Sequence, residues 1–253
     1  MSTDLFNLKG KVAVVTGSNK GLGQGIALGL AAAGADIVAV HRSDIGETKY
    51  EVEKAGRKFA SVEADLSDIN RVKDIIGEAA AAFGRVDILV NNAGVIKRHP
   101  AVEFPEDDWD LVLDVNLKSL FLLSQAAARQ FIAQESGGKI INIASMLSYQ
   151  GGILVPSYTA SKSAVIGLTR ALANEWAAYK INVNGIAPGY MATDNTEQLR
   201  KNKERYESIT ARIPAGRWGD PEDLQGAAVF LASAASDYVH GFTIAVDGGW
   251  LSR

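Results

Sequence analysis

The sequence predicts a single α/β domain built on a doubly wound parallel sheet of about seven strands, with helices on both faces. Short β-branched runs, apolar on both faces as buried parallel strands must be, alternate with longer helix-like stretches along the whole chain. No repeat or linker interrupts this alternation, and 253 residues with 47% hydrophobic side chains suffice for one large core. We therefore treat residues 1–253 as one domain.

The expected strands and helices alternate in the order that such a fold requires. The strands are expected at residues 11–16, 36–41, 59–62, 86–91, 139–145, 181–186 and 242–246. The helices are expected at residues 21–33, 45–55, 69–83, 106–133, 157–179 and 221–232. Capping residues at 65–67 and 219–221 mark two of the helix starts. Residues 187–213 are polar and lack a strand pattern, so we expect a loop with short helices there that acts as a substrate lid.

Composition and charge exclude several classes of protein. The absence of Cys rules out disulfides, thiolate nucleophiles and Cys-based metal sites, and the three His residues are isolated in sequence. We therefore expect no metal centre, unless carboxylates alone hold a hard cation. A formal net charge of −3 does not indicate the excess of positive charge that binding to nucleic acid or an anionic membrane requires. The start MSTDLFNLKGK lacks the pattern of a secretory signal, and no uncharged apolar run reaches the ~18 residues of a membrane span. We expect a cytoplasmic protein.

A glycine-rich turn follows the first expected strand. Residues 16–23 read TGSNKGLG, a TGxxxGxG pattern placed between an apolar strand and a helix. Glycines let the backbone approach a pyrophosphate, and the helix N-terminus offers N–H donors and a partial positive charge. The alternative is a turn that only connects strand and helix. The first interpretation gives a Rossmann-type fold with a dinucleotide held by Gly17, Ser18, Asn19, Lys20, Gly21, Leu22 and Gly23.

The end of the second expected strand bears on the choice of cofactor. NAD-selective sites place a carboxylate there to bind the ribose hydroxyls, whereas NADP sites place a cation. Here the position holds His41, followed by Arg42, and Lys20 lies in the glycine-rich turn. The cations Arg42 and Lys20 favour the 2′-phosphate of NADP(H), unless both are solvated surface charges or Asp44 reaches the ribose instead.

A tyrosine and a lysine four residues apart, Tyr158 and Lys162, lie on one face of an expected helix. The same spacing occurs at Tyr50 and Lys54, within a charged stretch where we expect an amphipathic surface helix. Tyr158 instead follows the fifth strand, whose carboxyl end faces the crevice where α/β proteins bind ligands, and Ser145 lies at that end. The context therefore favours Tyr158 and Lys162 as a catalytic pair.

These side chains predict hydride transfer between an alcohol and a nicotinamide. Transfer to a carbonyl leaves an alkoxide that must be protonated, and the reverse direction needs a base. Because a free tyrosine has a pKa of about 10, we expect the Lys162 ammonium, helped by oxidised nicotinamide, to lower the pKa of Tyr158. The Ser145 hydroxyl would donate a hydrogen bond to the substrate oxygen, and Lys162 would also bind the nicotinamide ribose.

Five motifs stand in order along the chain: TGxxxGxG at 16–23, NNAG at 91–94, Ser145, YxxxK at 158–162 and PG at 188–189. Together they resemble the short-chain dehydrogenase/reductase family over nearly the whole chain. The resemblance implies that Asn116 is a fourth catalytic residue and that Asn92 supports the central strand. It implies an adenine contact for Asp65 and a nicotinamide-amide contact for Thr193. Further cofactor contacts are implied at Leu66, Ala93, Gly94, Pro188, Gly189 and Met191, beside Tyr158 and Lys162.

Candidate substrate residues lie after Ser145 and after the NNAG motif. Met146 and Gln150 should line the substrate pocket, together with Tyr190. Arg98 and Arg217 are candidate clamps for a carboxylate, since Arg binds carboxylates with two parallel hydrogen bonds, unless each forms a surface ion pair.

Longer runs narrow the resemblance. INIASMLSYQGG, IAPGYMATDNT and RIPAGRWG are similar to family members that interconvert hydroxyl and ketone on six-carbon keto-deoxy sugar acids from pectin and other uronates. Those members are usually NAD-linked, which implies NAD(H), against the tendency of Lys20 and Arg42 towards NADP(H). They are typically homotetramers, so the resemblance implies a homotetramer, and the apolar tail at Trp250 and Leu251 fits a subunit contact.

Two other functions stay open. An NADPH-dependent reductase of 3-oxoacyl thioesters would want a basic patch for an acidic acyl carrier, which a chain of net charge −3 does not indicate. A cofactor-sensing regulator on the same fold could dispense with the Tyr–Lys pair, whereas Ser145, Tyr158 and Lys162 are all present here.

Overall fold

The computed structural model describes residues 3–253 and contains a seven-stranded sheet in the order β3-β2-β1-β4-β5-β6-β7. All six neighbouring strand pairs are parallel. The strands are β1 (Val12–Thr16), β2 (Asp36–His41), β3 (Phe59–Glu63), β4 (Ile88–Asn91), β5 (Gly138–Ile143), β6 (Ile181–Pro188) and β7 (Thr243–Val246). The predicted doubly wound, Rossmann-type sheet is confirmed. Residues 1–2, part of the start considered above, lie outside the described residues.

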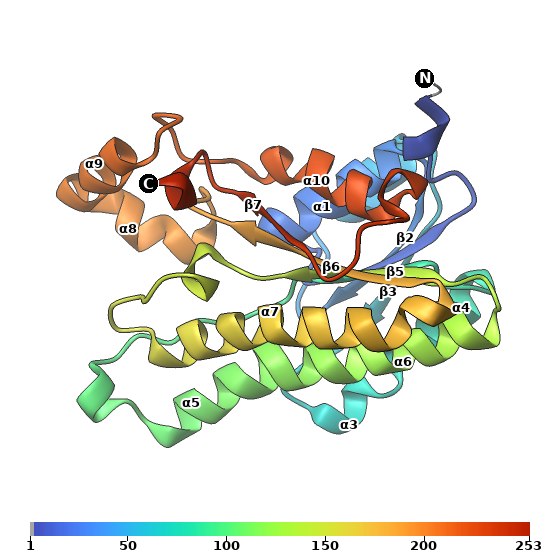
Figure 1. The fold of residues 1–253 in the computed structure, drawn as a ribbon, viewed down its shortest axis with the longest axis horizontal. Coiled ribbons are helices and arrows are strands. Elements are labelled where there is room, and N and C mark those ends of the chain that lie inside the picture. The colour runs from blue at the N-terminus through green and yellow to red at the C-terminus, as the bar shows by residue number, and fades with distance from the viewer. Residues whose placement is uncertain (1–2) are drawn as a thin grey trace.

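Helices cover both faces of the sheet (Figure 1). One face carries α1 and α10, and the other carries α4, α6 and α7. The helices are α1 (Gly21–Ala32), α2 (Thr48–Lys54), α3 (Ile69–Val72), α4 (Ile75–Phe83), α5 (Glu106–Leu113), α6 (Ser119–Ala133), α7 (Pro156–Trp176), α8 (Glu197–Lys201), α9 (Lys203–Arg212) and α10 (Gln225–Ala232). Two large apolar clusters, one on each face, form the core between the helices and the β-branched strands.

Several boundaries differ from those expected. The helix expected at 69–83 is divided into α3 and α4, and the side chain that caps α3 is Asp68, which accepts from two backbone N–H groups. Asp65 caps no helix and bonds Ser67 instead. The helix expected from residue 45 begins only at Thr48.

The region expected as a lid begins later than residue 187. Strand β6 runs to Pro188, because its backbone continues to pair with β7, with Ala187 opposite Ala245 and Pro188 opposite Val246. Beyond the strand lie a 3₁₀ turn at Asp194–Thr196 and the short helices α8 and α9. The expected loop with short helices is therefore present from residue 189 onwards. Figure 1 shows it at the left, beside the C-terminus.

The expected helix at 106–133 contains a π-helical turn at Asp114–Lys118 between α5 and α6. It is the one helix of residues 3–253 that is long and apolar enough to cross a membrane, and half of its apolar window is buried inside the fold. Burial of that kind is typical of the core helix of a globular protein, and α6 packs on β4 and β5. The π turn widens the helix by one residue per turn and so displaces Asn116 from regular α geometry.

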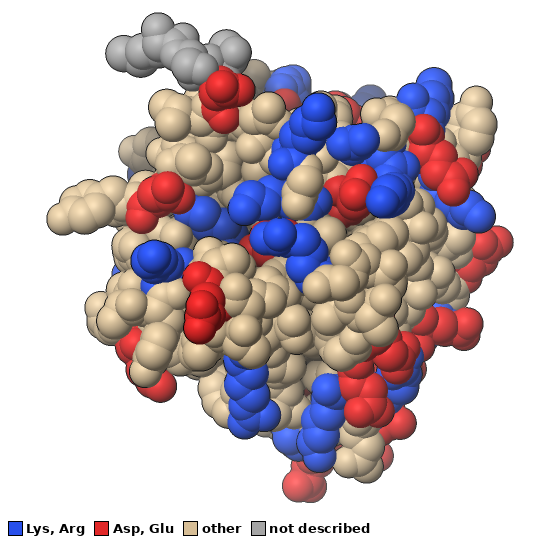
Figure 2. Space-filling model, turned by 90° about the vertical axis from the view of Figure 1, so that its right-hand side faces the viewer, with Lys and Arg blue, Asp and Glu red and all other residues tan. Residues whose placement is uncertain are grey.

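The amino ends of the strands form the face opposite the lid. Figure 2 looks at this face and shows Lys and Arg side chains gathered across its upper middle, with acidic side chains among them. At the amino ends of β1, β4 and β5, three cations have carboxylate partners. Asp87 lies 3.6 Å from Lys11 and also pairs with Arg85, and Lys139 lies 2.7 Å from Asp237.

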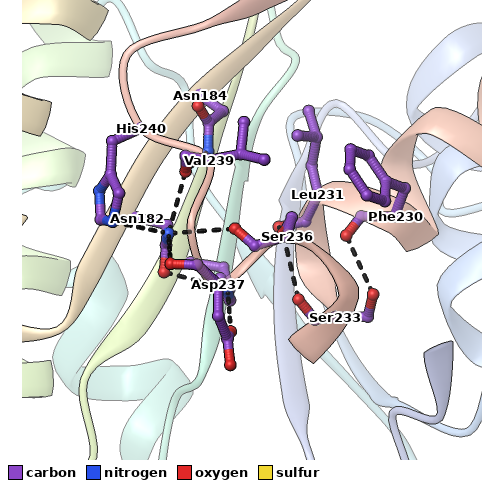
Figure 3. Close-up of polar contacts among 10 residues, drawn as sticks. Asn182, Asn184, Phe230, Leu231, Ser233, Ser236, Asp237, Val239 and His240 are labelled. Carbon is purple, nitrogen blue, oxygen red and sulfur yellow. Dashed lines mark hydrogen bonds and ion pairs between the residues drawn. The ribbon is translucent and has the colours of Figure 1, made fainter. Parts of the chain in front are cut away.

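Strand β7 is held beside β6 by side-chain amides (Figure 3). Asn182 Nδ2 lies within hydrogen-bond distance of the Asp237 and Val239 carbonyl oxygens, at 3.0 and 2.9 Å, and of His240 Nε2 at 3.1 Å. Asn184 Nδ2 donates to the same Val239 oxygen at 2.8 Å. These bonds fix the chain just before β7, and β7 in turn leads to the C-terminal tail near the lid.

Candidate active site

The glycine-rich turn lies at the carboxyl end of β1, beside β4, where the order of the strands reverses. α/β sheets bind ligands at such switch points. Gly17 and Gly21 have backbone φ angles of +65° and +57°, which residues other than glycine rarely adopt. Gly23 has no room for a side chain, since a Cβ there would lie 2.2 Å from the Gly17 carbonyl oxygen. The sequence therefore specifies this turn closely.

Thr16, the last residue of β1, joins the turn to the NNAG segment after β4. Its Oγ1 accepts from the backbone N–H of Asn92 at 3.0 Å and of Ala93 at 2.9 Å, and donates to Val90 O at 3.3 Å. The Asn92 side chain returns the contact through a 2.9 Å bond from Nδ2 to Thr16 O. The two motifs form one rigid unit.

The turn leaves hydrogen-bond donors free for an anion. Lys20 stands at the N-cap of α1 in an extended conformation, and no side chain caps the first turn of this helix. Ser18 is fully buried, and its Oγ has no hydrogen-bond partner among the described residues. An uncapped helix N-terminus and an unpaired buried hydroxyl beside close-packed glycines suit the pyrophosphate of a dinucleotide.

The cations near the end of β2 already have carboxylate partners. Lys20 Nζ lies 2.7 Å from Asp194 Oδ2, and Arg42 lies 3.5 Å from Asp65, in pairs that are largely exposed. Ser67, as hydrogen-bond donor, and the Arg42 charge hold the pKa of Asp65 below its ordinary value. Nearby, Leu66 is buried, and His41 Nδ1 lies 2.6 Å from Ser43 O.

Tyr158 and Lys162 lie in the first turns of α7, with the Lys162 nitrogen 5.8 Å from the centre of the tyrosine ring. Tyr50 and Lys54 have nearly the same geometry, at 5.7 Å, but Tyr50 is 64% exposed. Lys162 is 3% exposed and its ammonium donates to Ile143 O, at the end of β5, at 2.6 Å. Burial against the end of the sheet, and not the spacing, distinguishes the two pairs.

The pKa of Tyr158 moves in the direction opposite to that expected from the sequence. Burial of the phenol raises it, while a hydrogen bond with Ser145 and the charge of Arg98 lower it. The Lys162 charge is not among the causes that lower it. Burial also lowers the pKa of Lys162 to about 8, because desolvation penalises the ammonium. In the protein alone burial thus raises the pKa of Tyr158, and the lowering expected from Lys162 together with oxidised nicotinamide stays a prediction.

Ser145 follows β5 by two residues and begins a 3₁₀ turn, Met146–Ser148. Its Oγ accepts from the Leu147 N–H at 3.1 Å. Ser148 Oγ donates to Lys162 O at 2.6 Å, so this turn is tied to α7. The serine hydroxyl and the phenol of Tyr158 are thereby held side by side at the carboxyl end of the sheet.

Asn116 lies in the π turn and is buried. Its amide makes a reciprocal pair with the backbone of Val95: Oδ1 accepts from the N–H at 2.8 Å, and Nδ2 donates to the carbonyl oxygen at 3.0 Å. Nδ2 also lies 3.2 Å from Ser161 Oγ. A Cβ on Gly94 would lie 3.1 Å from Asn116 Oδ1 and 3.7 Å from Lys162 Nζ, so the NNAG segment passes close to both residues.

The residues expected to bind substrate are not all free to do so. Arg217 makes a bidentate ion pair with Asp223, at 2.7 and 2.8 Å, which is the surface-pair alternative. Gln150 accepts a 2.8 Å hydrogen bond on Oε1 from Trp250 Nε1. Arg98 extends towards the lid, where its Nη2 donates to Asn195 O at 3.1 Å. Of the two arginines, Arg98 is the one whose charge acts on Tyr158.

In the C-terminal tail Trp250 is buried, Leu251 is half-buried, and Ser252 and Arg253 are exposed. Trp250 is only 5% exposed, and its ring centre lies 4.9 Å from that of Tyr190 and 4.1 Å from the Arg212 guanidinium carbon. Trp250 is therefore packed within its own chain and is not the exposed aromatic that was expected, while a subunit contact through Leu251 stays a prediction. Tyr190 and Trp250 instead join Met146 in an apolar cluster beneath α9, so the tail supports the lid.

The family model described as enoyl-(acyl carrier protein) reductase matches residues 17–251. The chain belongs to the short-chain dehydrogenase/reductase family. It is 64% identical to the 2-dehydro-3-deoxy-D-gluconate 5-dehydrogenase of Dickeya dadantii (strain 3937), over all of both chains. It is 62% identical to the enzyme of the same name from Escherichia coli (strain K12), also over all of both chains.

Two solved structures of this family share the fold. One is a candidate 2-deoxy-D-gluconate 3-dehydrogenase from Agrobacterium tumefaciens with bound NADP, 55% identical, with a TM-score of 0.94 over 99% of this chain and 100% of that one. The other is a gluconate 5-dehydrogenase from Burkholderia cenocepacia J2315 in complex with NADP and tartrate, 42% identical, with a TM-score of 0.94 over 99% and 98% of the two chains. The enzyme class predicted from the sequence agrees with these relatives.

Residues 188–193, which the family resemblance places near the nicotinamide, lead from the end of β6 into the lid. A Cβ on Gly189 would lie 2.1 Å from Met146 Sδ, so a side chain after Pro188 would have to displace Met146. Met191 is buried, and Thr193 begins the 3₁₀ turn that carries Asp194.

Sequence analysis missed three contributors to the site. Thr16 stands first in the TGxxxGxG motif and could have been found there. Asp194 accepts a hydrogen bond from Lys20, and Asn195 accepts one from Arg98. Both lie far from these partners in sequence, so no sequence pattern indicated the contacts.

Proposed function

We propose that the protein is an NAD(P)-dependent dehydrogenase that interconverts a secondary alcohol and a ketone on a sugar acid, with 2-dehydro-3-deoxy-D-gluconate as the substrate oxidised at C5. The observation that carries this proposal is the identity of 64% and 62%, over complete chains, to two enzymes of that name. The cluster of Ser145, Tyr158 and Lys162 at the carboxyl end of the sheet supports it independently. The sequence favours no 3-oxoacyl carrier, and neither of these relatives is named for one.

Tyr158 is the proton donor and acceptor in this proposal. Because burial raises the pKa of Tyr158, the phenol is protonated at neutral pH, which suits protonation of the alkoxide during reduction. When bound, an oxidised nicotinamide would supply the hydride acceptor for the oxidation direction, and its positive charge would favour the phenolate of Tyr158. Ser145, held beside the phenol, donates to the substrate oxygen and orients it. The proton leaves the alcohol for Tyr158 as the carbonyl forms.

Lys162 and Asn116 act behind the phenol. The Lys162 ammonium, fixed by Ile143 O, would bind the nicotinamide ribose and, only together with a bound oxidised nicotinamide, favour the phenolate of Tyr158. Asn116 has its side chain committed to Val95 and Ser161, so its contribution is to hold the NNAG segment and α7 at a fixed spacing.

The cofactor proposed is NAD(P)(H), with NADP(H) favoured. The pyrophosphate would lie on the N-terminus of α1 with Ser18 Oγ as an additional donor. The exposed cations Lys20 and Arg42 suit a 2′-phosphate, and NADP is the nucleotide in solved relatives. Replacing Arg42 with Asp should shift the preference from NADPH towards NADH, and an unchanged ratio would remove Arg42 from the argument.

Arg98 is the proposed clamp for the substrate carboxylate. It is the arginine whose charge acts on Tyr158, and within residues 3–253 its guanidinium makes one hydrogen bond, to Asn195 O, which leaves other donors for a ligand. Met146, Gln150 and Tyr190 would form the pocket wall. We do not assign Arg217 to the substrate, because Asp223 already holds its guanidinium.

Residues 189–213 are the proposed lid. Asp194 bonds Lys20 of the glycine-rich turn and Asn195 bonds Arg98, so one turn of the lid touches the residues proposed for the nucleotide and for the carboxylate. A homotetramer, a cytoplasmic location and a place in uronate or pectin degradation also belong to the proposal, and the family resemblance supports them.

The Tyr158→Phe variant tests the proposed chemistry. Loss of a positioned acid–base group costs about 10²- to 10⁴-fold in rate, while nucleotide affinity should stay close to that of the unaltered protein. Nucleotide affinity is measured by quenching of Trp fluorescence, and rate by the absorbance of the reduced nicotinamide. Undiminished turnover would sink the catalytic assignment.

A further inference from the structure

The residues immediately before and after Arg98, Lys97 and His99, both bind the carboxylate of Asp108. Lys97 Nζ lies 2.8 Å from Asp108 Oδ1, and His99 Nε2 lies 2.7 Å from Asp108 Oδ2. A carboxylate only accepts hydrogen bonds, so His99 Nε2 carries the hydrogen. Asp108 stands in the first turn of α5, where Lys97 and His99 hold its pKa below the ordinary value. Each of its oxygens thus binds one neighbour of Arg98.

Arg98 points elsewhere. While the side chains of Lys97 and His99 reach α5, the Arg98 guanidinium reaches the lid at Asn195 O, and its charge acts on the phenol of Tyr158. The two outer side chains therefore lie towards α5, and the side chain between them lies towards the lid. Holding the two outer residues on α5 therefore directs the middle one into the site.

The segment has no helix or strand to fix it by itself. From residue 92 to residue 100 the chain is irregular, so its side-chain bonds decide its path. Asn116 holds it at Val95. At the other end, His99 precedes Pro100, which restricts it to extended conformations, and its N–H donates to Leu154 O at 3.0 Å. Between Val95 and Pro100, the Asp108 carboxylate binds the side chains of Lys97 and His99.

We propose that Asp108 is a positioning residue that, by binding both neighbours of Arg98, directs the Arg98 guanidinium at the carboxylate of the substrate. The inference rests on the proposed function for its substrate, and extends it to a residue on α5 that touches neither the reacting atoms nor the cofactor. The second carboxylate oxygen of Asp108 matters as well as its shape, because an amide oxygen could accept from only one of the two neighbours while the NH₂ group opposes the N–H of the other.

The test compares Asp108→Asn with Asp107→Asn. Asp107 is an exposed carboxylate in the same helical turn, so the control removes the same charge from the N-terminus of α5 and leaves Lys97 and His99 in place. With 2-dehydro-3-deoxy-D-gluconate, Asp108→Asn should raise KM about tenfold and change kcat little, as expected when a bidentate carboxylate contact is misaligned. With the methyl ester of the same sugar acid, both variants should keep the KM of the unaltered protein.

Two further variants make the result specific. In an Arg98→Ala background, Asp108→Asn should add no further increase in KM, since the residue it positions is gone. Asp108→Glu, which keeps the charge, should recover most of the affinity. Equal KM values for Asp108→Asn and Asp107→Asn, or additive effects of Arg98→Ala and Asp108→Asn, would overturn the proposal.

A second readout needs no turnover, so it separates this proposal from the proposed function. The difference in ultraviolet phenolate absorbance between each protein and its Tyr158→Phe derivative isolates the titration of Tyr158. Because the Arg98 charge lowers the pKa of Tyr158, the Asp108→Asn background should show this titration at higher pH, and the Asp107→Asn background should not. If the unaltered protein fails to oxidise the sugar acid, the proposed substrate is wrong, and this titration still decides the role of Asp108. An unmoved midpoint would contradict it.

Discussion

Removal of the Asn116 side chain should destabilise the fold by an amount that the structure allows us to work out. The residue is buried in the π turn, and its amide satisfies both backbone groups of Val95 and contacts Ser161 Oγ. Asn116→Ala would leave the Val95 N–H and carbonyl without their partners. It would also release the NNAG segment from the π turn that carries residue 116.

The expected loss follows from these contacts. A buried backbone group left unsatisfied costs about 1–3 kcal/mol. Val95 is half-buried, so water replaces part of each bond, and the two groups together give a loss of about 3 kcal/mol in the free energy of unfolding. For a domain of this size each kcal/mol lowers Tm by roughly 2–4 °C, so Tm should fall by about 9 °C.

The assay is urea and thermal unfolding followed by circular dichroism at one protein concentration. Ser161→Ala serves as the comparison, because it removes the contact of Asn116 with Ser161 and leaves both bonds to Val95 in place. It should cost about 1 kcal/mol. If Asn116→Ala lost less than Ser161→Ala, the reciprocal pair with Val95 would not hold the segment, and the reasoning from contacts to stability would be refuted.

Three other predictions test the turn, the buried lysine and the tail. Gly23→Ala should abolish nucleotide binding in a fluorescence titration, since its Cβ would lie 2.2 Å from a carbonyl oxygen of the turn, whereas Gly77→Ala, whose Cβ meets nothing within 4 Å, should bind normally. Burial lowers the pKa of Lys162 from 10.5 to about 8, so between these pH values the unfolded chain binds more protons than the folded one, and stability should rise with pH. At about 1.4 kcal/mol per pKa unit the total rise is about 3 kcal/mol, and a Lys162→Met variant without nucleotide should lack it in urea unfolding. Trp250→Phe, which loses the 2.8 Å bond to Gln150 and part of a buried ring, should cost about 2 kcal/mol, and an unchanged Tm would restore the view of an exposed tail.

The strands and the catalytic cluster were predictable from the sequence because their signals are local. Buried parallel strands need apolar residues on both faces, and 11–16 and 36–41 show this directly. Tyr158 and Lys162 are four residues apart on one helix, so their proximity follows from helical geometry. Their burial follows from the place of α7 after β5.

Contacts between distant segments could not be predicted. Gln150 meets Trp250 across 100 residues, and Lys20 meets Asp194 across 174. The pKa of Tyr158 depends on how deeply the fold buries the phenol, which the spacing to Lys162 does not reveal. The pair of Arg217 with Asp223 spans only six residues, yet nothing in that spacing alone distinguishes a surface ion pair from a free clamp.

The most direct test of the proposed function is the absorbance of reduced nicotinamide after 2-dehydro-3-deoxy-D-gluconate is mixed with the unaltered protein and either NADP⁺ or NAD⁺. The account predicts turnover that depends on the sugar acid, with the better nucleotide reporting on Lys20 and Arg42. Absence of turnover with both nucleotides, in a protein that binds them and reduces other ketones, would contradict the sugar-acid assignment.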